Sequence, residues 1–296
     1  MKKFIAILTA LAIFFSFAGC VSQPQSEGKE PVSVSAGESN DSVSKKANSE
    51  VSVAEKVVFD GNGIKITVKG LGTDGLFGPE LKLLVENNGS QNVTVQVRNL
   101  SVNGIMADST FSCDVASGKK ANDEISISSS GLKAAGIEVI KDIEFSFHII
   151  DSDSWDNIVD SDVIRIETDA DHSYVQTVDD SGFVAVDRDG IKIVIKKLDS
   201  EDSFWGADVY VYVENNSGKD ITVQARDVSV NGFMADPSFS CDVPAGKKAF
   251  DTITFMESDL ESNGITDITT LELSFHVFDM NNWDGIFDSD TVTVTF

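Results

Sequence analysis

The sequence is poor in the residues on which most catalytic sites depend. Its 296 residues include three histidines and three cysteines. No G-x-S-x-G, H-E-x-x-H, C-x-x-C or glycine-rich phosphate motif occurs. Basic residues are also scarce, since 23 lysines and arginines stand against 48 acidic residues and the formal net charge is −25. Such a surface repels phosphate backbones. We therefore expect neither an enzyme nor a nucleic-acid-binding protein.

Long apolar runs are absent except near the N-terminus, where one apolar stretch follows Lys2 and Lys3 and ends in small residues. The stretch is too short and wrongly flanked for an ordinary membrane-spanning helix, so residues 1–20 are predicted to be a secretory signal peptide. Its last residues, Phe-Ala-Gly-Cys, resemble the lipobox of bacterial lipoproteins, with Phe17 in place of the usual leucine. The resemblance implies that Cys20 is lipidated and anchors the protein on the extracellular side of the cell membrane. The alternative is an incidental cysteine beside a conventional cleavage site.

The segment 21–55 has no aromatic residue and is rich in serine, glutamate, lysine and asparagine. A segment of this composition does not bury enough apolar surface to offset the entropy lost on ordering. We therefore predict a disordered, flexible tether between the anchor and the folded part of the chain.

The remainder of the chain is one sequence unit present twice. From Glu86 onward, about half of the positions are identical to the residue 128 positions later. Upstream the offset is 127, which places a one-residue insertion in the loop after Leu71. A period of this length indicates a duplicated domain, not a solenoid repeat. The acidic stretch 169–182 lacks apolar periodicity and is predicted to link repeat 1 (56–168) to repeat 2 (183–296).

Alternating apolar and polar residues predict β-strands in both repeats. Lys82 stands where repeat 2 has Tyr210, so this position faces outward while Leu81 and Leu83 face the core. One helix is expected over 129–136. About seven short strands in about 110 residues are typical of a two-sheet sandwich. The expected fold class is all-β, with two tandem immunoglobulin-like β-sandwich domains.

The two repeats resemble the telokin-like, immunoglobulin-like extracellular domains of uncharacterised lipoproteins from low-GC Gram-positive bacteria. The resemblance rests on E-N-N, on the V-N-G and G-K-K-A turns, on G-I-x-x-I, and on the ending F-H-x-x-D…W-D…D-S-D. These motifs occur in both copies and span nearly everything after Glu55. Members of that family mostly have no assigned activity, so the resemblance implies a fold and a location but no mechanism.

Two cysteines occupy equivalent positions in the repeats. Cys113 and Cys241 have the strand phase that faces the core, so we expect buried free thiols that act as small apolar side chains. A disulfide between the repeats and a reactive thiol are the alternatives. His148 and His276 have the opposite phase and are expected to face outward, which argues against a catalytic Cys–His pair.

Matched acidic loops are the first candidate ligand site. Each has the pattern D-x-[D/N]-x-W-D followed by D-S-D, but tryptophan and an acid replace two elements that an EF-hand requires. One interpretation is a weak extracellular Ca²⁺ site. The other is a hairpin whose carboxylates accept hydrogen bonds from turn backbones while the tryptophan packs on the sandwich end. No further cofactor is expected. The candidate metal ligands are Asp151, Asp153, Asp156, Asp162, Asp279, Asn281, Asp284 and Asp290.

Aromatic residues in loops are the second candidate. Phe77, Phe204 and Trp205 lie in the loop that carries the insertion, and Trp155 and Trp283 lie in the acidic loops. Exposed rings there would stack on a glycan or contact a protein partner. The alternative is that they cover the open end of the core.

These features together predict a monomeric, non-catalytic lipoprotein of the cell surface, which binds a protein or glycan ligand at the bacterial envelope. Two other functions remain as alternatives: a structural spacer without a ligand, and a Ca²⁺-dependent accessory enzyme.

Overall fold

The computed structural model describes residues 51–200, 203 and 205–296. The predicted signal peptide, the lipidation residue Cys20, most of the predicted tether and Phe204 lie outside the described residues. Within the described part, no helix is long and apolar enough to cross a membrane.

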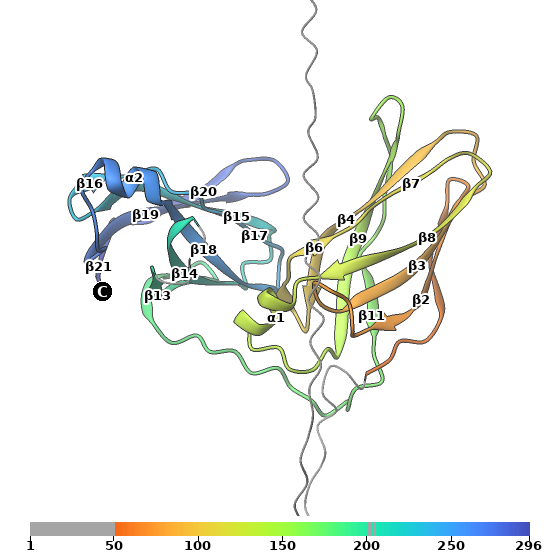
Figure 1. Ribbon diagram of the computed structural model, residues 1–296, viewed down its shortest axis with the longest axis horizontal. Helices are drawn as coiled ribbons and strands as arrows, with labels where there is room; N and C mark the ends of the chain where they lie inside the picture. The colour runs from red at the N-terminus through yellow and green to blue at the C-terminus, as the bar shows by residue number, and fades with distance from the viewer. Residues whose placement is uncertain (1–50, 201–202, 204) are drawn as a thin grey trace, which may run out of the picture. The chain divides into compact units, whose positions relative to one another are not determined.

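Repeat 1 consists of two packed sheets (Figure 1). In one sheet the strand order is β1–β2–β3–β8–β6, and in the other β9 is flanked by β4 on one side and by β10 and β11 on the other. The bounds are β1 (Lys56–Gly61), β2 (Ile64–Gly72), β3 (Glu80–Asn87), β4 (Val93–Val102), β5 (Ile105–Met106), β6 (Ser109–Thr110), β7 (Ser112–Val115), β8 (Lys120–Ile127), α1 (Ser129–Ala134), β9 (Asp142–Asp151), β10 (Asn157–Asp160) and β11 (Ile164–Glu167).

Repeat 2 has the same arrangement. Its first sheet runs β12–β13–β14–β18, and in its second β19 is flanked by β15 and by β20 and β21. The bounds are β12 (Phe183–Arg188), β13 (Ile191–Asp199), β14 (Gly206–Asn215), β15 (Ile221–Val230), β16 (Phe233–Met234), β17 (Ser240–Val243), β18 (Lys248–Met256), α2 (Glu257–Ser262), β19 (Thr270–Asp279), β20 (Gly285–Asp288) and β21 (Val292–Thr295).

Each sandwich has its own apolar core, and the predicted faces are confirmed. Leu81, Leu83 and Val85 are buried while Lys82 is exposed. The described residues are almost entirely strands and loops with two short helices, so the all-β sandwich prediction is confirmed. The predicted helix is α1, which Ser128 caps by accepting the Gly131 amide through its hydroxyl. The second helix, α2, was not predicted.

The asparagine of each E-N-N motif is a structural residue. Asn87 is buried, and its Nδ2 donates to the carbonyl oxygens of Gln91 (2.8 Å) and Val115 (2.9 Å). Its Oδ1 accepts the Gly89 amide at 2.9 Å. Asn215 repeats the arrangement. The side chain joins a turn to the neighbouring strand, which accounts for this duplicated motif without a ligand.

The boundary of the predicted tether lies too late in the sequence. Val51 is buried in the repeat 1 core and Val53 packs against it, because apolar residues before Glu55 continue into the sandwich. At the other end, Ala170 is buried in the same core and Tyr174 packs on it. The first part of the predicted linker therefore belongs to repeat 1.

Candidate functional site: the exposed aromatic loops

The acidic loop of repeat 1 is a tight hairpin between β9 and β10. Asp151 Oδ1 accepts the backbone amides of Asp153 (2.8 Å) and Ser154 (3.1 Å), and its Oδ2 accepts Gln91 Nε2 (2.6 Å). These hydrogen bonds, with the Asp153 amide the largest contribution, lower the pKa of Asp151. The carboxylate is therefore held by donors within its own turn and by one neighbouring side chain.

The corresponding loop of repeat 2 has the same construction. Asp279 Oδ1 accepts the Asn281 amide at 3.0 Å, and Asn281 Nδ2 lies 3.3 Å from Asp220 Oδ2. No group of three or more histidine, cysteine, aspartate or glutamate side chains in the described part of the chain is placed to hold a metal ion. The acidic side chains of the candidate Ca²⁺ site therefore form no such group there. This statement covers Asp151, Asp153, Asp156, Asp162, Asp279, Asp284 and Asp290, whereas the candidate Asn281 is of another residue type.

The tryptophan of each hairpin has a left-handed backbone conformation. Trp155 and Trp283 have φ angles of 64° and 65°. Their amides donate to the carbonyls of Asp151 and Asp279, both at 2.9 Å, and so close the turns. Glycine, or asparagine with its short polar side chain, usually occupies such a position, because other side chains there cost about 1–2 kcal/mol. Yet the indoles are 70% and 76% exposed, so neither is buried against the sandwich end as one interpretation predicted.

In repeat 2 the exposed indole is supported from one side. The Trp283 ring stacks on Phe278 with 5.5 Å between centroids and 18° between planes, and His276 stacks on Phe278 at 5.4 Å. Phe278 itself is buried. Repeat 1 has Ile150 at the equivalent position. Trp283 therefore presents a supported aromatic surface to solvent.

Beside these hairpins, each outer sheet face carries a histidine–aspartate pair. His148 Nδ1 lies 2.5 Å from Asp160 Oδ1, and His276 Nδ1 lies 2.6 Å from Asp288 Oδ1. The hydrogen bond from His148 is the main cause that lowers the pKa of Asp160. Gln96 lies opposite His148 in the strand register. The half-buried histidines do face outward, as predicted.

The cysteines lie on the opposite face of the same sheet. Both are buried and free, as predicted. Burial, followed by the carboxylate of Asp123, raises the pKa of Cys113 to about 12. Burial likewise raises the pKa of Cys241. Neither cysteine thus provides a thiolate near neutral pH, and the histidines are paired with carboxylates instead.

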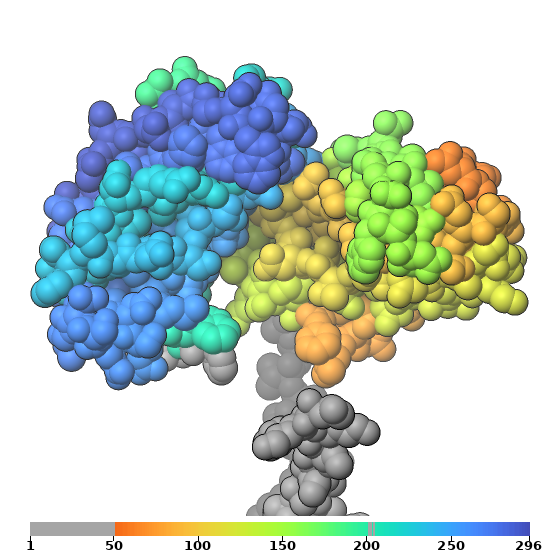
Figure 2. Space-filling view, turned by 90° about the horizontal axis from the view of Figure 1, so that it is seen from above, coloured from red at the N-terminus to blue at the C-terminus, as the bar shows by residue number. Residues whose placement is uncertain are grey.

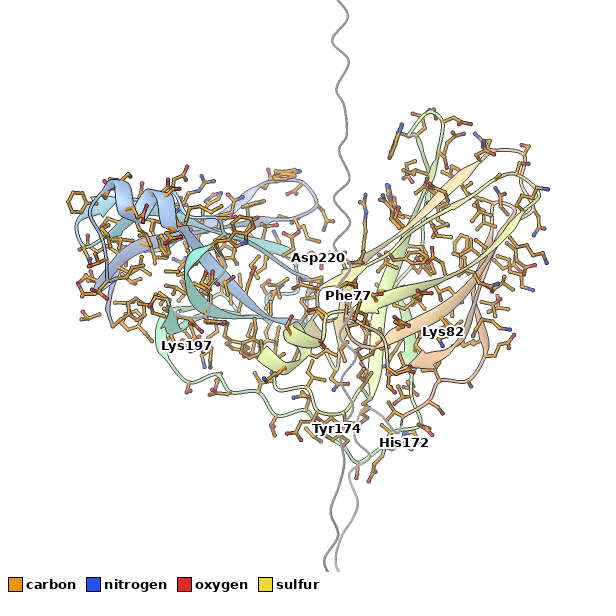
Figure 3. The ribbon with its side chains drawn as sticks, viewed as in Figure 1. Phe77, Lys82, His172, Tyr174, Lys197 and Asp220 are labelled. Carbon is orange, nitrogen blue, oxygen red and sulfur yellow. The ribbon has the colours of Figure 1, made fainter. Side chains whose placement is uncertain are left out.

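The loop before β3 presents another exposed ring, at the other end of repeat 1 (Figure 3). Phe77 is 71% exposed, and Trp205 at the equivalent place in repeat 2 is 57% exposed. The Phe77 carbonyl accepts the Ser129 amide at 2.9 Å, and the Trp205 carbonyl accepts the Glu257 amide at 2.7 Å. These backbone bonds hold both loops against the start of a helix. The interpretation that the rings cover the core is therefore wrong for both residues.

A glycine after each ring permits this close approach. Gly78 has φ 141°, and a Cβ there would lie 2.2 Å from the Ile127 carbonyl oxygen. Gly206 has φ 146°, and a Cβ there would lie 2.5 Å from the Glu257 amide nitrogen. Only glycine therefore fits, and it lets the backbone of the preceding aromatic residue lie against the start of the helix.

The exposed ring of repeat 1 borders a hollow lined with hydroxyl groups. The hollow has a volume of about 540 Å³ and lies beside Leu76 and Phe77. Repeat 2 has proline, methionine and glutamate at three of the equivalent serine positions, so this lining is specific to repeat 1. The lining hydroxyl residues are Ser109, Thr110, Ser126, Ser128, Ser129 and Ser130.

The two aromatic loops of repeat 1 lie at opposite ends of the sandwich. Phe77 precedes the first residue of β3, whereas the last residue of β3 joins the turn that leads to Val93, and Val93 lies opposite Asp151. In Figure 2 the segment around residues 150–160 stands out from the surface of the repeat. The structure therefore does not bring Phe77 together with Trp155, and it forms two separate aromatic surfaces per repeat.

Sequence reasoning missed the histidine–aspartate pairs and the serine-rich hollow. The first had a visible signal, because F-H and D-S-D recur in both repeats at the same spacing. The second had the run Ser128-Ser129-Ser130. Neither signal indicates proximity, which depends on strand register and on the path of the loop before β3.

No protein-family model and no curated protein matches this chain. Thirty chains among solved structures match it. One is the crystal structure of the YadV chaperone, with a TM-score of 0.21, 10% identity, and coverage of 73% of this chain and 92% of that chain. A likeness of this size carries no argument about the function of the present protein.

Proposed function

We propose that the protein is a non-catalytic binding module of the bacterial envelope, which recognises a protein or glycan ligand through its exposed aromatic loops. The observation that carries the proposal is the left-handed, exposed tryptophan in each repeat. A ring kept at a position that favours glycine is unfavourable for folding, and such strain is characteristic of functional positions.

The lipobox-like ending at Cys20 supports a lipid anchor, and the acidic composition supports a soluble, solvated extracellular region. In this proposal the anchor keeps the two sandwiches at the outer side of the membrane, and the hairpins of Trp155 and Trp283 each supply one exposed indole as a contact surface. Aromatic rings give a large contact area at low entropic cost, which suits both sugar rings and protein surfaces.

The test is capture from an envelope extract with the immobilised chain, in parallel with a Trp155→Ala/Trp283→Ala variant. We expect wild type to enrich one protein or one glycan fraction reproducibly, and the variant to lose at least about 90% of it, since central aromatic anchors each contribute about 2 kcal/mol or more. Capture by a Phe77→Ala variant tests whether the loop at the other end of the sandwich also contributes to binding. Equal, negligible capture by all three chains would favour the structural spacer instead.

A further inference from the structure

The two repeats contact each other through two unlike surfaces. β5 of repeat 1 runs parallel to β18 of repeat 2, with Ile105 opposite Lys248. The Lys248 amide donates to the Gly104 carbonyl at 3.1 Å, and Lys247 Nζ lies 2.5 Å from Glu144 Oε2. Contacts of this kind, in which different patches meet, form a heterologous interface.

Side chains from both repeats bury apolar area at this contact. Met106 packs against the repeat 2 core, and Phe250 packs against the repeat 1 core. We call Gly104, Ile105, Met106 and Glu144 the donor surface, and Lys247, Lys248 and Phe250 the acceptor surface.

Because the chain is a duplication, it carries each surface twice and uses each once. A second donor surface lies on repeat 2, at Gly232, Phe233, Met234 and Glu272. A second acceptor surface lies on repeat 1, at Lys119, Lys120 and Asn122. The unused surfaces carry the same charges as the surfaces that pair within the chain, because Glu272 is equivalent to Glu144 and Lys119 is equivalent to Lys247.

Exposure separates the used donor surface from the unused one. Ile105 is 1% exposed and belongs to the repeat 1 core, whereas its counterpart Phe233 is 49% exposed. Met106 is half-buried, whereas Met234 is 69% exposed. β16, which holds both exposed residues, lies beside α2 (Figure 1), and a cavity of about 270 Å³ between them is lined by Met234, Leu260 and Ile265. Phe233 and Met234 thus remain exposed to solvent, whereas the equivalent side chains of repeat 1 are buried or half-buried.

The unused acceptor surface has a strand edge that no other described strand pairs with. β8 pairs with β3 along one side, from Lys120 to Ser126, but with β6 only at Ser126 and Ile127 on the other. The edge from Lys120 onward therefore offers backbone groups, as the edge of β18 offers them to Gly104 in repeat 2. Lys119 and Lys120 are exposed there.

The hydrogen bonding of a nearby serine differs between Glu272 in repeat 2 and the equivalent Glu144 in repeat 1. In repeat 2, Ser229 Oγ donates to Glu272 Oε2 at 3.0 Å. In repeat 1 the equivalent hydroxyl, Ser101 Oγ, is buried and has no hydrogen-bond partner among the described residues, while Glu144 bonds Lys247 and Arg165. Glu144 is thus engaged across the contact, and Glu272 is held by its own repeat.

We propose that a second copy of this chain binds head to tail, with the donor surface at β16 of one molecule on the acceptor surface at β8 of the next. The contact repeats the strand bridge and the ion pair inside the chain, with Phe233 opposite Lys120 and Glu272 beside Lys119, while Asn122 stands where the internal contact has Phe250. Each molecule keeps one free surface of each kind, so association continues beyond the dimer. One strand bridge and one ion pair make a small contact, and the net charge of −25 opposes it. Association is therefore weak and dependent on concentration and salt.

The test is disulfide trapping in the full chain, with the double variant Lys120→Cys/Phe233→Cys under mild oxidation in physiological salt. We expect a ladder of dimers and larger species on a non-reducing gel, and no ladder from either single variant. The matched control is Ile105→Cys/Lys248→Cys, which places the pair at the contact within one chain and should give only a cross-linked monomer. A double variant that stays monomeric while the control oxidises would overturn the proposal.

A second readout avoids any dependence on the new cysteines. Glu272→Lys and Lys119→Glu each place like charges at the proposed contact, so each variant alone should sediment as a monomer at concentrations where wild type associates. A mixture of the two variants restores opposite charges at every contact and should associate again. If the two variants associate separately as strongly as wild type does, the assignment of this surface is wrong.

Discussion

At the scale of single residues, the hairpin tryptophans combine strain with exposure. Between the two hairpins three loop residues differ, since Ser152, Asp153 and Ser154 correspond to Met280, Asn281 and Asn282, whereas the tryptophan and the aspartate after it are identical. The tryptophan has stayed at a position where its backbone is unfavourable. The exposed ring at a strained backbone position is therefore the feature that needs a functional explanation.

Replacement of Trp155 by glycine should stabilise the fold while removing the ring. Glycine relieves the left-handed strain and loses some of that gain to backbone entropy, so the free energy of unfolding should rise by roughly 0.5–1 kcal/mol. Urea denaturation measures it. Trp155→Ala is the control, because alanine removes the ring but keeps the strain. A glycine variant no more stable than the alanine variant would contradict the strain argument.

Asp251 predicts a pH dependence of stability. Burial, with contributions from the carboxylates of Asp108 and Asp242, raises the pKa of Asp251 above its ordinary value of 3.8. A raised pKa in the folded state means that stability is fully present below the unfolded-state pKa and declines as pH rises through the folded-state value. Asp251→Asn should therefore unfold at higher urea concentration than wild type at pH 7, and the difference should vanish as pH falls toward 3.8.

The control for this pH effect is the wild-type protein, measured beside Asp251→Asn at both pH values. A stabilisation by Asp251→Asn that is the same at both pH values would show that charge is not its cause.

At the scale of elements, the turn between β14 and β15 depends on one buried amide. Asn215 Nδ2 donates to the carbonyls of Lys219 and Val243, both at 2.7 Å. Asn215→Ala leaves those buried acceptors without a donor, so the free energy of unfolding should fall by about 2–3 kcal/mol. Thermal or urea unfolding measures the change. Asn216→Ala, on the exposed neighbour, should change it by less than about 0.5 kcal/mol; equal effects would contradict this role for Asn215.

The elements themselves differ in how far the sequence predicts them. Period-two alternation and comparison of the repeats identify the long strands and their buried faces, because burial acts on every second residue. α2 escapes prediction, since Leu260 is its only apolar residue. The two-residue strands β5 and β16 are too short for any periodic signal and depend on tertiary contacts.

The loops show where prediction from sequence ends. The hydrogen bonds of Asp151 to its own turn follow from local pattern and agree with one of the two interpretations. The exposure of Phe77 does not follow, because it depends on the bond between its carbonyl and Ser129, a residue 52 positions later. From sequence alone, an aromatic residue in a loop is compatible with burial or with exposure, because the path of the loop backbone is not known.

At the scale of the whole molecule, the two repeats share their structural residues but differ in the surfaces that they expose. The buried asparagines and the cysteines recur because both sandwiches need them. The serine-rich hollow occurs in repeat 1 and the Phe278–Trp283 stack in repeat 2, so the two repeats present different surfaces for ligands. Sequence comparison showed the duplication. The surfaces that each copy leaves exposed could be identified only from the contact between the repeats in the structure.

The central claim, that the aromatic hairpins contact the ligand, has a direct spectroscopic test. The chain has three tryptophans, and all three are exposed, at 70%, 57% and 76% for Trp155, Trp205 and Trp283. Fluorine NMR of the fluorotryptophan-labelled protein during titration with envelope fractions therefore observes the proposed contacts without background. We predict that the fraction captured by the protein shifts the Trp155 or Trp283 resonance, which single Trp→Phe variants assign. Three unchanged resonances in the presence of a captured ligand would contradict the account.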